Sequence, residues 1–367
     1  HPVTEAITGL DLVEWQLRVA HGERLPLAQD QLRITGHAIE ARICAESPDN
    51  QFLPATGRLQ VYRKPEHVSF VRALGHCKVR VDDGFREGDA ISPFYDSMLA
   101  KLIVVGDDRA QALARLDAAL AGMHVVGLNT NVQFLRHVVR SRSFAQADLD
   151  TALIERERAV LFHQEPIGAD FAVAAATAHT LLQERALEQA DPFSRRDGWR
   201  PFGVSTRRLG FEFHGDPIEA VLTYRHDGSL HLQVGAAEGS LAFAATEAGI
   251  DVGFAGQRHL VQVYRQGDQC HVFALHGATR ILAVDLLDHA ADGHADAGRL
   301  SAPMPGKLLS FAVKAGDKVR KGQALAVMEA MKMEHTIAAP QDGTVAALLY
   351  APGDQVAEGA ELLTLES

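Results

Sequence analysis

A single lysine, Lys332, lies between two similar segments near the end of this 367-residue sequence. Residues 302–329 align without a gap with residues 339–366, each residue pairing with the one 37 positions further on. Identical residues at matching positions include Pro303/Pro340, Gly316/Gly353, Asp317/Asp354, Gly322/Gly359 and Glu329/Glu366. Alternating apolar residues and Gly-Asp turns in both copies predict two interlocked β-halves related by a pseudo-twofold axis. We therefore expect Lys332 at an exposed hairpin tip, where another enzyme can modify its amine.

The residues around this lysine, Glu329-Ala330-Met331-Lys332-Met333, resemble the biotinyl (biotin carboxyl carrier) domain of biotin-dependent carboxylases. The resemblance implies an all-β barrel-sandwich hybrid fold over residues 300–367, with biotin joined to Lys332 through an amide bond. It also implies that Met331 and Met333 pack the turn and are recognised by the biotin protein ligase. A lipoyl domain is the nearest alternative, since it shares the duplicated fold, but its turn typically reads Asp-Lys-Ala.

The composition of the chain argues against several classes of partner and site. The net charge of −11 and pI near 5.9 argue against nucleic acid or an anionic membrane as partner. No apolar stretch reaches the roughly 18 residues that span a bilayer. The three cysteines lack C-x-x-C pairing and the histidines form no H-E-x-x-H motif, so we expect neither disulfides nor a metal site.

The N-terminal third mixes strands and helices. Period-two patterns predict strands over 35–46, 57–63, 77–82 and 98–105, and an amphipathic helix follows over 108–123. Asn129 is the expected cap of the next helix.

Two motifs here, Gly36-His37-Ala38-Ile39-Glu40-Ala41-Arg42-Ile43 and Tyr95-Asp96-Ser97-Met98, resemble the C-terminal part of an ATP-grasp biotin carboxylase domain. That family uses ATP, Mg²⁺ and bicarbonate to carboxylate biotin. The resemblance implies that Arg42 stabilises the oxyanion of deprotonated biotin, a task for a cation that keeps its charge. A surface Arg–Glu pair is the alternative. Asp96 matches an aspartate of the active-site rim, with turn capping as its alternative.

The sequence starts at His1, without methionine and within a motif, so we expect a piece of a longer protein. The residues that bind ATP, Mg²⁺ and bicarbonate are expected before residue 1. On that interpretation this part does not turn over ATP by itself.

In the middle of the chain the pattern changes to one long helix followed by a series of strands. An Ala-rich helix is predicted over 167–189, and period-two runs continue to about residue 286, with a hairpin turn at His226-Asp227-Gly228-Ser229. This pattern predicts an antiparallel barrel wrapped on the helix. Residues 288–299, nearly all Ala, Asp, Gly and His, read as a flexible linker.

The predicted fold is thus multidomain α+β. The expected divisions are the biotin carboxylase part, a helix-plus-barrel tethering domain, a linker and the biotinyl domain, over residues 1–160, 161–287, 288–299 and 300–367.

This domain order resembles the α subunits of acyl-CoA carboxylases, most strongly 3-methylcrotonyl-CoA carboxylase, which implies a role in leucine breakdown. The resemblance implies a separate carboxyltransferase β subunit that selects the acyl-CoA. Geranyl-CoA and propionyl-CoA carboxylases, and a carrier in a biotin-dependent decarboxylase or an acyltransferase, stay open as alternatives. The expected compartment is the bacterial cytoplasm, or the mitochondrial matrix in a eukaryote.

Overall fold

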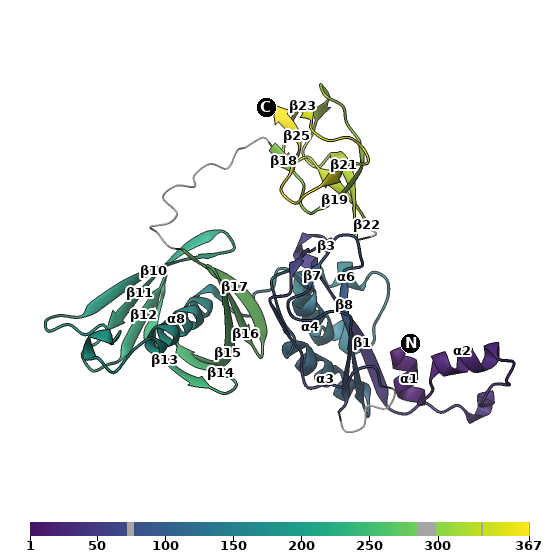
Figure 1. Cartoon of the computed structure of the whole chain (residues 1–367), viewed down its shortest axis with the longest axis horizontal. Coiled ribbons are helices and arrows are strands. Elements are labelled where there is room, and N and C mark those ends of the chain that lie inside the picture. The colour runs from purple at the N-terminus through teal and green to yellow at the C-terminus, as the bar shows by residue number, and fades with distance from the viewer. Residues whose placement is uncertain (72–76, 285–298, 332, 367) are drawn as a thin grey trace. The chain divides into compact units, whose positions relative to one another are not determined.

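The computed structural model describes residues 1–71, 77–284, 299–331 and 333–366 (Figure 1). The chain divides into two compact units, His1–His163 with His294–Ser367, and Gln164–Gly293. The predicted multidomain α+β class is confirmed.

The N-terminal region is built on a three-stranded antiparallel sheet of order β1-β8-β6 (β1 His37–Cys44, β8 Met98–Gly106, β6 Val79–Asp83). The helix α3 (Arg109–Ala121) begins where the Asp108 side chain accepts a hydrogen bond from the Gln111 N–H at 2.8 Å. Its buried face joins the sheet residues in one apolar core. Short paired strands complete the region: β2 Glu46–Ser47, β3 Leu53–Pro54, β4 Gly57–Arg58, β5 Val61–Arg63, β7 Ala90–Ile91 and β9 His124–Val126.

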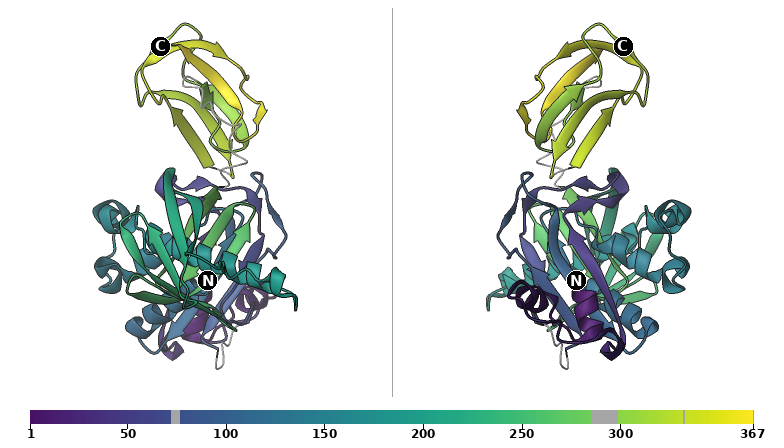
Figure 2. Two further views of the ribbon diagram at one scale, coloured as in Figure 1. Left: turned by 90° about the vertical axis from the view of Figure 1, so that its left-hand side faces the viewer. Right: turned by 90° about the vertical axis from the view of Figure 1, so that its right-hand side faces the viewer.

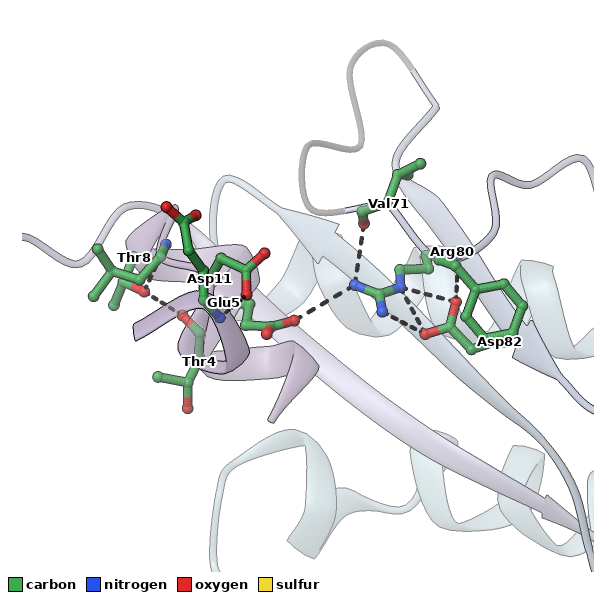
Figure 3. Close-up of polar contacts among 10 residues, drawn as sticks. Thr4, Glu5, Thr8, Asp11, Val71, Arg80 and Asp82 are labelled. Atoms are coloured by element: carbon green, nitrogen blue, oxygen red, sulfur yellow. Dashed lines mark hydrogen bonds and ion pairs between the residues drawn. The ribbon is translucent and has the colours of Figure 1, made fainter. Parts of the chain in front are cut away.

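A buried ion cluster holds the first helix against this sheet (Figure 3). The Arg80 guanidinium of β6 donates to both Asp82 carboxylate oxygens at 2.7 and 3.0 Å, and to the Val71 carbonyl at 3.0 Å. It also faces the Glu5 carboxylate of α1 (Pro2–Thr8) at 3.7 Å. Because these three charged side chains are largely buried, their mutual satisfaction fixes α1 to β6. The second helix, α2, spans Leu12–Ala20.

One predicted helix cap is wrong. The helix α4 starts at Val132, so Asn131 occupies the N-cap position instead of Asn129, and its side chain makes no capping hydrogen bond. The capping hydrogen bond is missing because the Asn131 side-chain amide is bonded to the backbone of β1 instead. Helices α4 (Val132–Arg140), α5 (Arg142–Ala145), α6 (Leu153–Arg156) and α7 (Arg158–Leu161) then lead out of this region.

The middle unit is a closed eight-stranded antiparallel barrel around one helix, α8 (Ala169–Ala186), as predicted. Alanine on α8 lets the strands approach the helix closely, while Phe171 fills the space between them. The strands are β10 Ser205–Phe213, β11 Asp216–Tyr224, β12 Leu230–Val234, β13 Ala237–Thr246, β14 Gly249–Phe254, β15 Gln257–Gln266, β16 Gln269–Ala274 and β17 Gly277–Val284. The predicted turn at 226–229 joins β11 to β12. The sequence indicates β15 and β17 least clearly, because polar and small residues interrupt their period-two pattern.

The C-terminal β-domain consists of two four-stranded sheets, seen from two sides in Figure 2. Their orders are β18-β25-β23-β20 and β22-β21-β19-β24. The strands are β18 Arg299–Ser301, β19 Gly306–Phe311, β20 Lys318–Val319, β21 Ala324–Ala330, β22 Met333–Ala338, β23 Gly343–Leu348, β24 Gln355–Val356 and β25 Glu361–Glu366. Of the predicted linker only Arg299 lies within the described residues, and it begins β18.

The predicted pseudo-twofold relation between the halves is confirmed by reciprocal hydrogen bonds. The Gly316 N–H donates to the Val345 carbonyl, and the equivalent Gly353 N–H donates to the Leu308 carbonyl, both at 2.7 Å. Each half thus satisfies backbone groups of the other, so neither half folds as a separate sheet.

Candidate functional site

The hairpin between β21 and β22 carries the predicted modification site. Ala330 pairs with Met333, so the loop between the strands consists of two residues, Met331 and Lys332. Met331 has a φ of 47°, the left-handed backbone that two-residue hairpin loops require at their first position. Lys332 itself and the side chain of Met333 lie outside the described residues. Of the two loop residues only Met331 is described, and it is 5% exposed.

This hairpin is supported up to its last residue pair. The β21 side chains of Leu325, Met328 and Ala330 are buried in the domain core. On the neighbouring strand Gly306 approaches so closely that a Cβ there would lie 2.6 Å from the Glu329 carbonyl oxygen. A rigid hairpin with a short loop fits the attachment of a covalent group that another protein must find in one fixed position.

The second candidate group is Arg42 on β1. Arg42 pairs directly with Lys101 of β8, so two cationic side chains leave the same face of the sheet side by side. The Glu40 carboxylate lies 3.4 Å from Arg42 Nε and 3.9 Å from Lys101 Nζ. Glu40 is 16% exposed whereas the Arg42 side chain is 68% exposed. On the far side of Lys101 lies Asp82 of β6, which is itself paired with Arg80. The exposed guanidinium of Arg42 can therefore still bind an anion.

The sequence alone assigns no role to Lys101. The pairing register that sets it opposite Arg42 joins residues far apart in the sequence, and periodicity does not reveal register. The predicted alternative of a plain Arg42–Glu40 surface pair thus omits the second cation.

Asp96 precedes β8, and its side chain accepts a hydrogen bond from the Met98 N–H at 3.0 Å. This is an Asx turn, the capping geometry that was the alternative for this residue. Among the described residues no hydrogen bond or ion pair joins Asp96 to Arg42. The neighbouring Ser97 hydroxyl donates to Glu46 at 2.5 Å, which ties the start of β8 to the chain beyond β1.

Between Arg42 and Glu46 lies the half-buried thiol of Cys44. Burial, and next the Glu46 carboxylate, raise the pKa of this thiol from 9.0 to about 11. The thiol is therefore neutral at physiological pH and neither attacks a ligand nor competes with an anion for Arg42.

Within the described ranges no group of three potential metal-ligating side chains occurs, and no helix is long and apolar enough to cross a membrane.

Three protein families match three successive segments of the chain, in the same order as the structural regions described above. Residues 40–156 match the biotin carboxylase C-terminal domain, and residues 168–286 match the BT domain of the methylcrotonyl-CoA carboxylase α subunit. Residues 298–365 match the family described as biotin-requiring enzyme, which contains the lysine hairpin. Residues 1–28 match the ATP-binding domain of the carbamoyl-phosphate synthase L chain.

Curated relatives are similar to this chain over its whole length. The mitochondrial methylcrotonoyl-CoA carboxylase subunit α of Rattus norvegicus is 35% identical, over 100% of this chain and 52% of the relative. The propionyl-CoA carboxylase α chain of Sus scrofa is 31% identical, over 100% of this chain and 51% of the relative. The chain thus spans about half the length of the curated relatives that it matches.

Among solved structures, the biotin carboxylase domain of Hydrogenobacter thermophilus 2-oxoglutarate carboxylase, in complex with MgADP, ADP and bicarbonate, is 36% identical. The match covers 45% of this chain and 34% of that chain, with a TM-score of 0.41.

We predict that iodoacetamide alkylates Cys44 about 100-fold more slowly in the folded protein at pH 8 than in urea. Only the thiolate reacts, and a rise in the pKa from 9.0 to about 11 lowers the thiolate fraction by about that factor. The difference should shrink as the pH rises toward 11. Peptide mapping by mass spectrometry measures the rate, with Cys77 as internal reference. Equal rates for Cys44 in the folded and unfolded protein would contradict the burial of this thiol.

Proposed function

We propose, since the chain belongs to the α subunits of biotin-dependent acyl-CoA carboxylases, that it carries biotin on Lys332 and supplies Arg42 to the carboxylation of that biotin. The observation that carries the proposal is the order of the three matched domains, with the two-residue lysine hairpin inside the last. A carrier in a decarboxylase or an acyltransferase does not need a biotin carboxylase domain, so the match over residues 40–156 favours the carboxylase.

When attached, biotin supplies the ring nitrogen that accepts the carboxyl group. This nitrogen is a very weak acid, so its reaction requires a fixed cation where negative charge develops. Arg42 meets this requirement because its guanidinium is charged at any physiological pH and is exposed on a rigid strand. Glu40 holds the guanidinium from one side, leaving its other N–H groups free to donate to an oxyanion.

Lys101 adds to the positive potential at this place. Two like charges directly opposite each other destabilise a sheet, and a bound anion relieves that repulsion. We therefore propose that Arg42 and Lys101 act as a pair, and that Asp96 contributes by shaping the turn before β8.

The helix-plus-barrel unit has a different task, which we propose is docking to a carboxyltransferase β subunit. The loop after α8 exposes three aromatic side chains, Phe193, Trp199 and Phe202, to 97%, 75% and 90%. The loop is fixed at Gly198, where a Cβ would lie 2.4 Å from the Tyr224 ring of β11. Large, exposed aromatic side chains on an anchored loop are typical of protein–protein interfaces.

The proposed substrate is 3-methylcrotonyl-CoA, chosen by the β subunit. Its support is the BT-domain family over residues 168–286 and the methylcrotonoyl-CoA carboxylase relatives. Propionyl-CoA is the second candidate, because the propionyl-CoA carboxylase α chains are nearly as similar. A panel of acyl-CoA substrates, assayed with the assembled enzyme, separates the two.

Lys332→Arg is predicted to abolish biotinylation by the biotin protein ligase, because arginine keeps the charge but not the primary amine that forms the amide. Streptavidin blotting of the cellular protein measures this. Lys321→Arg, in the same domain, is the matched control and should keep the wild-type signal. Biotin on the Lys332→Arg variant would rule out this attachment site.

Arg42→Ala, in a subunit that joins this chain to an ATP-binding half, should lower the rate of biotin carboxylation by about 10²-fold or more, as expected for a lost oxyanion donor. Arg258→Ala is the matched control, since Arg258 is another exposed strand arginine paired with a carboxylate, Asp251. Carboxylation at near wild-type rate in the Arg42→Ala variant would contradict a role in catalysis and make Arg42 a structural surface residue.

Serine at Phe193, Trp199 and Phe202 together should weaken binding to the β subunit by at least about 30-fold, the loss expected when an interface anchor is removed. Biotinylation should be unchanged. Surface plasmon resonance measures the affinity, with Leu275→Ser, an exposed apolar residue elsewhere on the barrel, as control. Wild-type affinity of the triple variant would exclude this loop from the interface.

A further inference from the structure

The strand that carries Arg42 lies at the edge of its sheet, and one residue from another part of the chain pairs with its outer side. Among the strands that the structure describes, β1 is hydrogen-bonded to β8 alone, along one of its sides. On the other side the Asn131 side chain accepts from the Cys44 N–H at 2.9 Å and donates to the Arg42 carbonyl at 3.0 Å. The Asn131 backbone N–H donates to the Cys44 carbonyl at 3.1 Å.

These three bonds are the ones that a neighbouring strand would make. In a strand, the N–H and carbonyl of one residue point to the same side, and the residue two positions away repeats that direction. Asn131 therefore satisfies the outward-facing carbonyl of Arg42 and both outward-facing backbone groups of Cys44. It is 8% exposed, so little water is present to replace it.

Asn131 does this at the expense of its own helix. It occupies the N-cap position of α4, where asparagine normally bonds to the helix backbone, yet no such bond is formed. The side chain thus serves β1 and not α4.

Asn131 bonds to β1 at the place where the pairing between β1 and β8 is irregular. Ile43 pairs with Ala100, but Cys44 pairs with Met98, which leaves Leu99 as an extra residue on β8. A bulge disrupts the ladder locally and bends the strand. Without Asn131, the β1 backbone would lose its outer partner just where the pairing with β8 becomes irregular, between Ile43 and Cys44.

We propose that Asn131 is a positioning residue, which fixes the β1 backbone at Arg42 and Cys44 and so holds the Arg42 guanidinium where negative charge develops. The inference rests on the proposed role of Arg42 but concerns a residue that acts through it.

Asn131→Asp tests this with almost no change in shape. The aspartate still accepts from the Cys44 N–H but cannot donate to the Arg42 carbonyl, which it repels. In the subunit that joins this chain to an ATP-binding half, biotin carboxylation should fall roughly 10- to 100-fold, the loss expected when a reacting group is misplaced. Asn129→Asp, at an exposed asparagine two residues earlier, is the matched control and should keep the wild-type rate.

A double-mutant cycle separates positioning from general damage. If Asn131 acts through Arg42, adding Asn131→Asp to Arg42→Ala should cause no further loss in rate. Equal additional losses in both backgrounds would overturn the proposal. If Arg42→Ala itself had no effect, the proposed function of Arg42 would fail, whatever Asn131 does.

Hydrogen exchange at the Cys44 amide gives a readout that needs no activity. It should accelerate at least about tenfold in Asn131→Ser, which keeps a good helix cap but is too short to bridge to β1. The Ser variant also serves if the Asp variant does not fold. Unchanged exchange at Cys44, or faster exchange together with wild-type carboxylation, would overturn the proposal.

Discussion

The antiparallel register between β1 and β8 is the constraint on which the candidate catalytic surface depends. It sets Arg42 directly opposite Lys101, so that two cations share one face, with the Glu40 carboxylate within 4 Å of both. A slip of one residue would send Arg42 to the opposite, core-facing side, where Ile43 is now fully buried. The packing of Ile43 therefore determines where the charge of Arg42 is presented.

The lysine hairpin is held by a different constraint, which is the exchange of hydrogen bonds between two copies of one segment. The turn glycines Gly316 and Gly353 each donate to a strand of the other copy. Since neither copy satisfies its backbone alone, the two copies are expected to fold together, and the hairpin between them with both.

The sequence reveals the parts of the protein in which the pattern is local. The repeat at a spacing of 37 residues predicts the symmetric β-domain, and the Ala-rich stretch over 167–189 predicts the helix inside the barrel. What it does not reveal is which residues meet across long separations. Lys101 gains significance only from strand register, and Asn131 only from its bonds to β1, 87 and 89 residues away in the sequence. The same holds for β15 and β17, whose inward residues are recognisable once the barrel closes around α8.

The register of β1 with β8 and the hydrogen bonds between the repeated segments stabilise two different parts of the chain. The charge stabilisation proposed for Arg42 requires a strand that holds its place, and β1 meets this because its backbone is bonded on one side by β8 and on the other by Asn131. Presenting a hairpin loop in a fixed place requires a stiff β-domain, which the duplicated fold favours through hydrogen bonds between its two copies. The two requirements are therefore met by two different sets of hydrogen bonds, one at the edge strand β1 and one between the repeated segments.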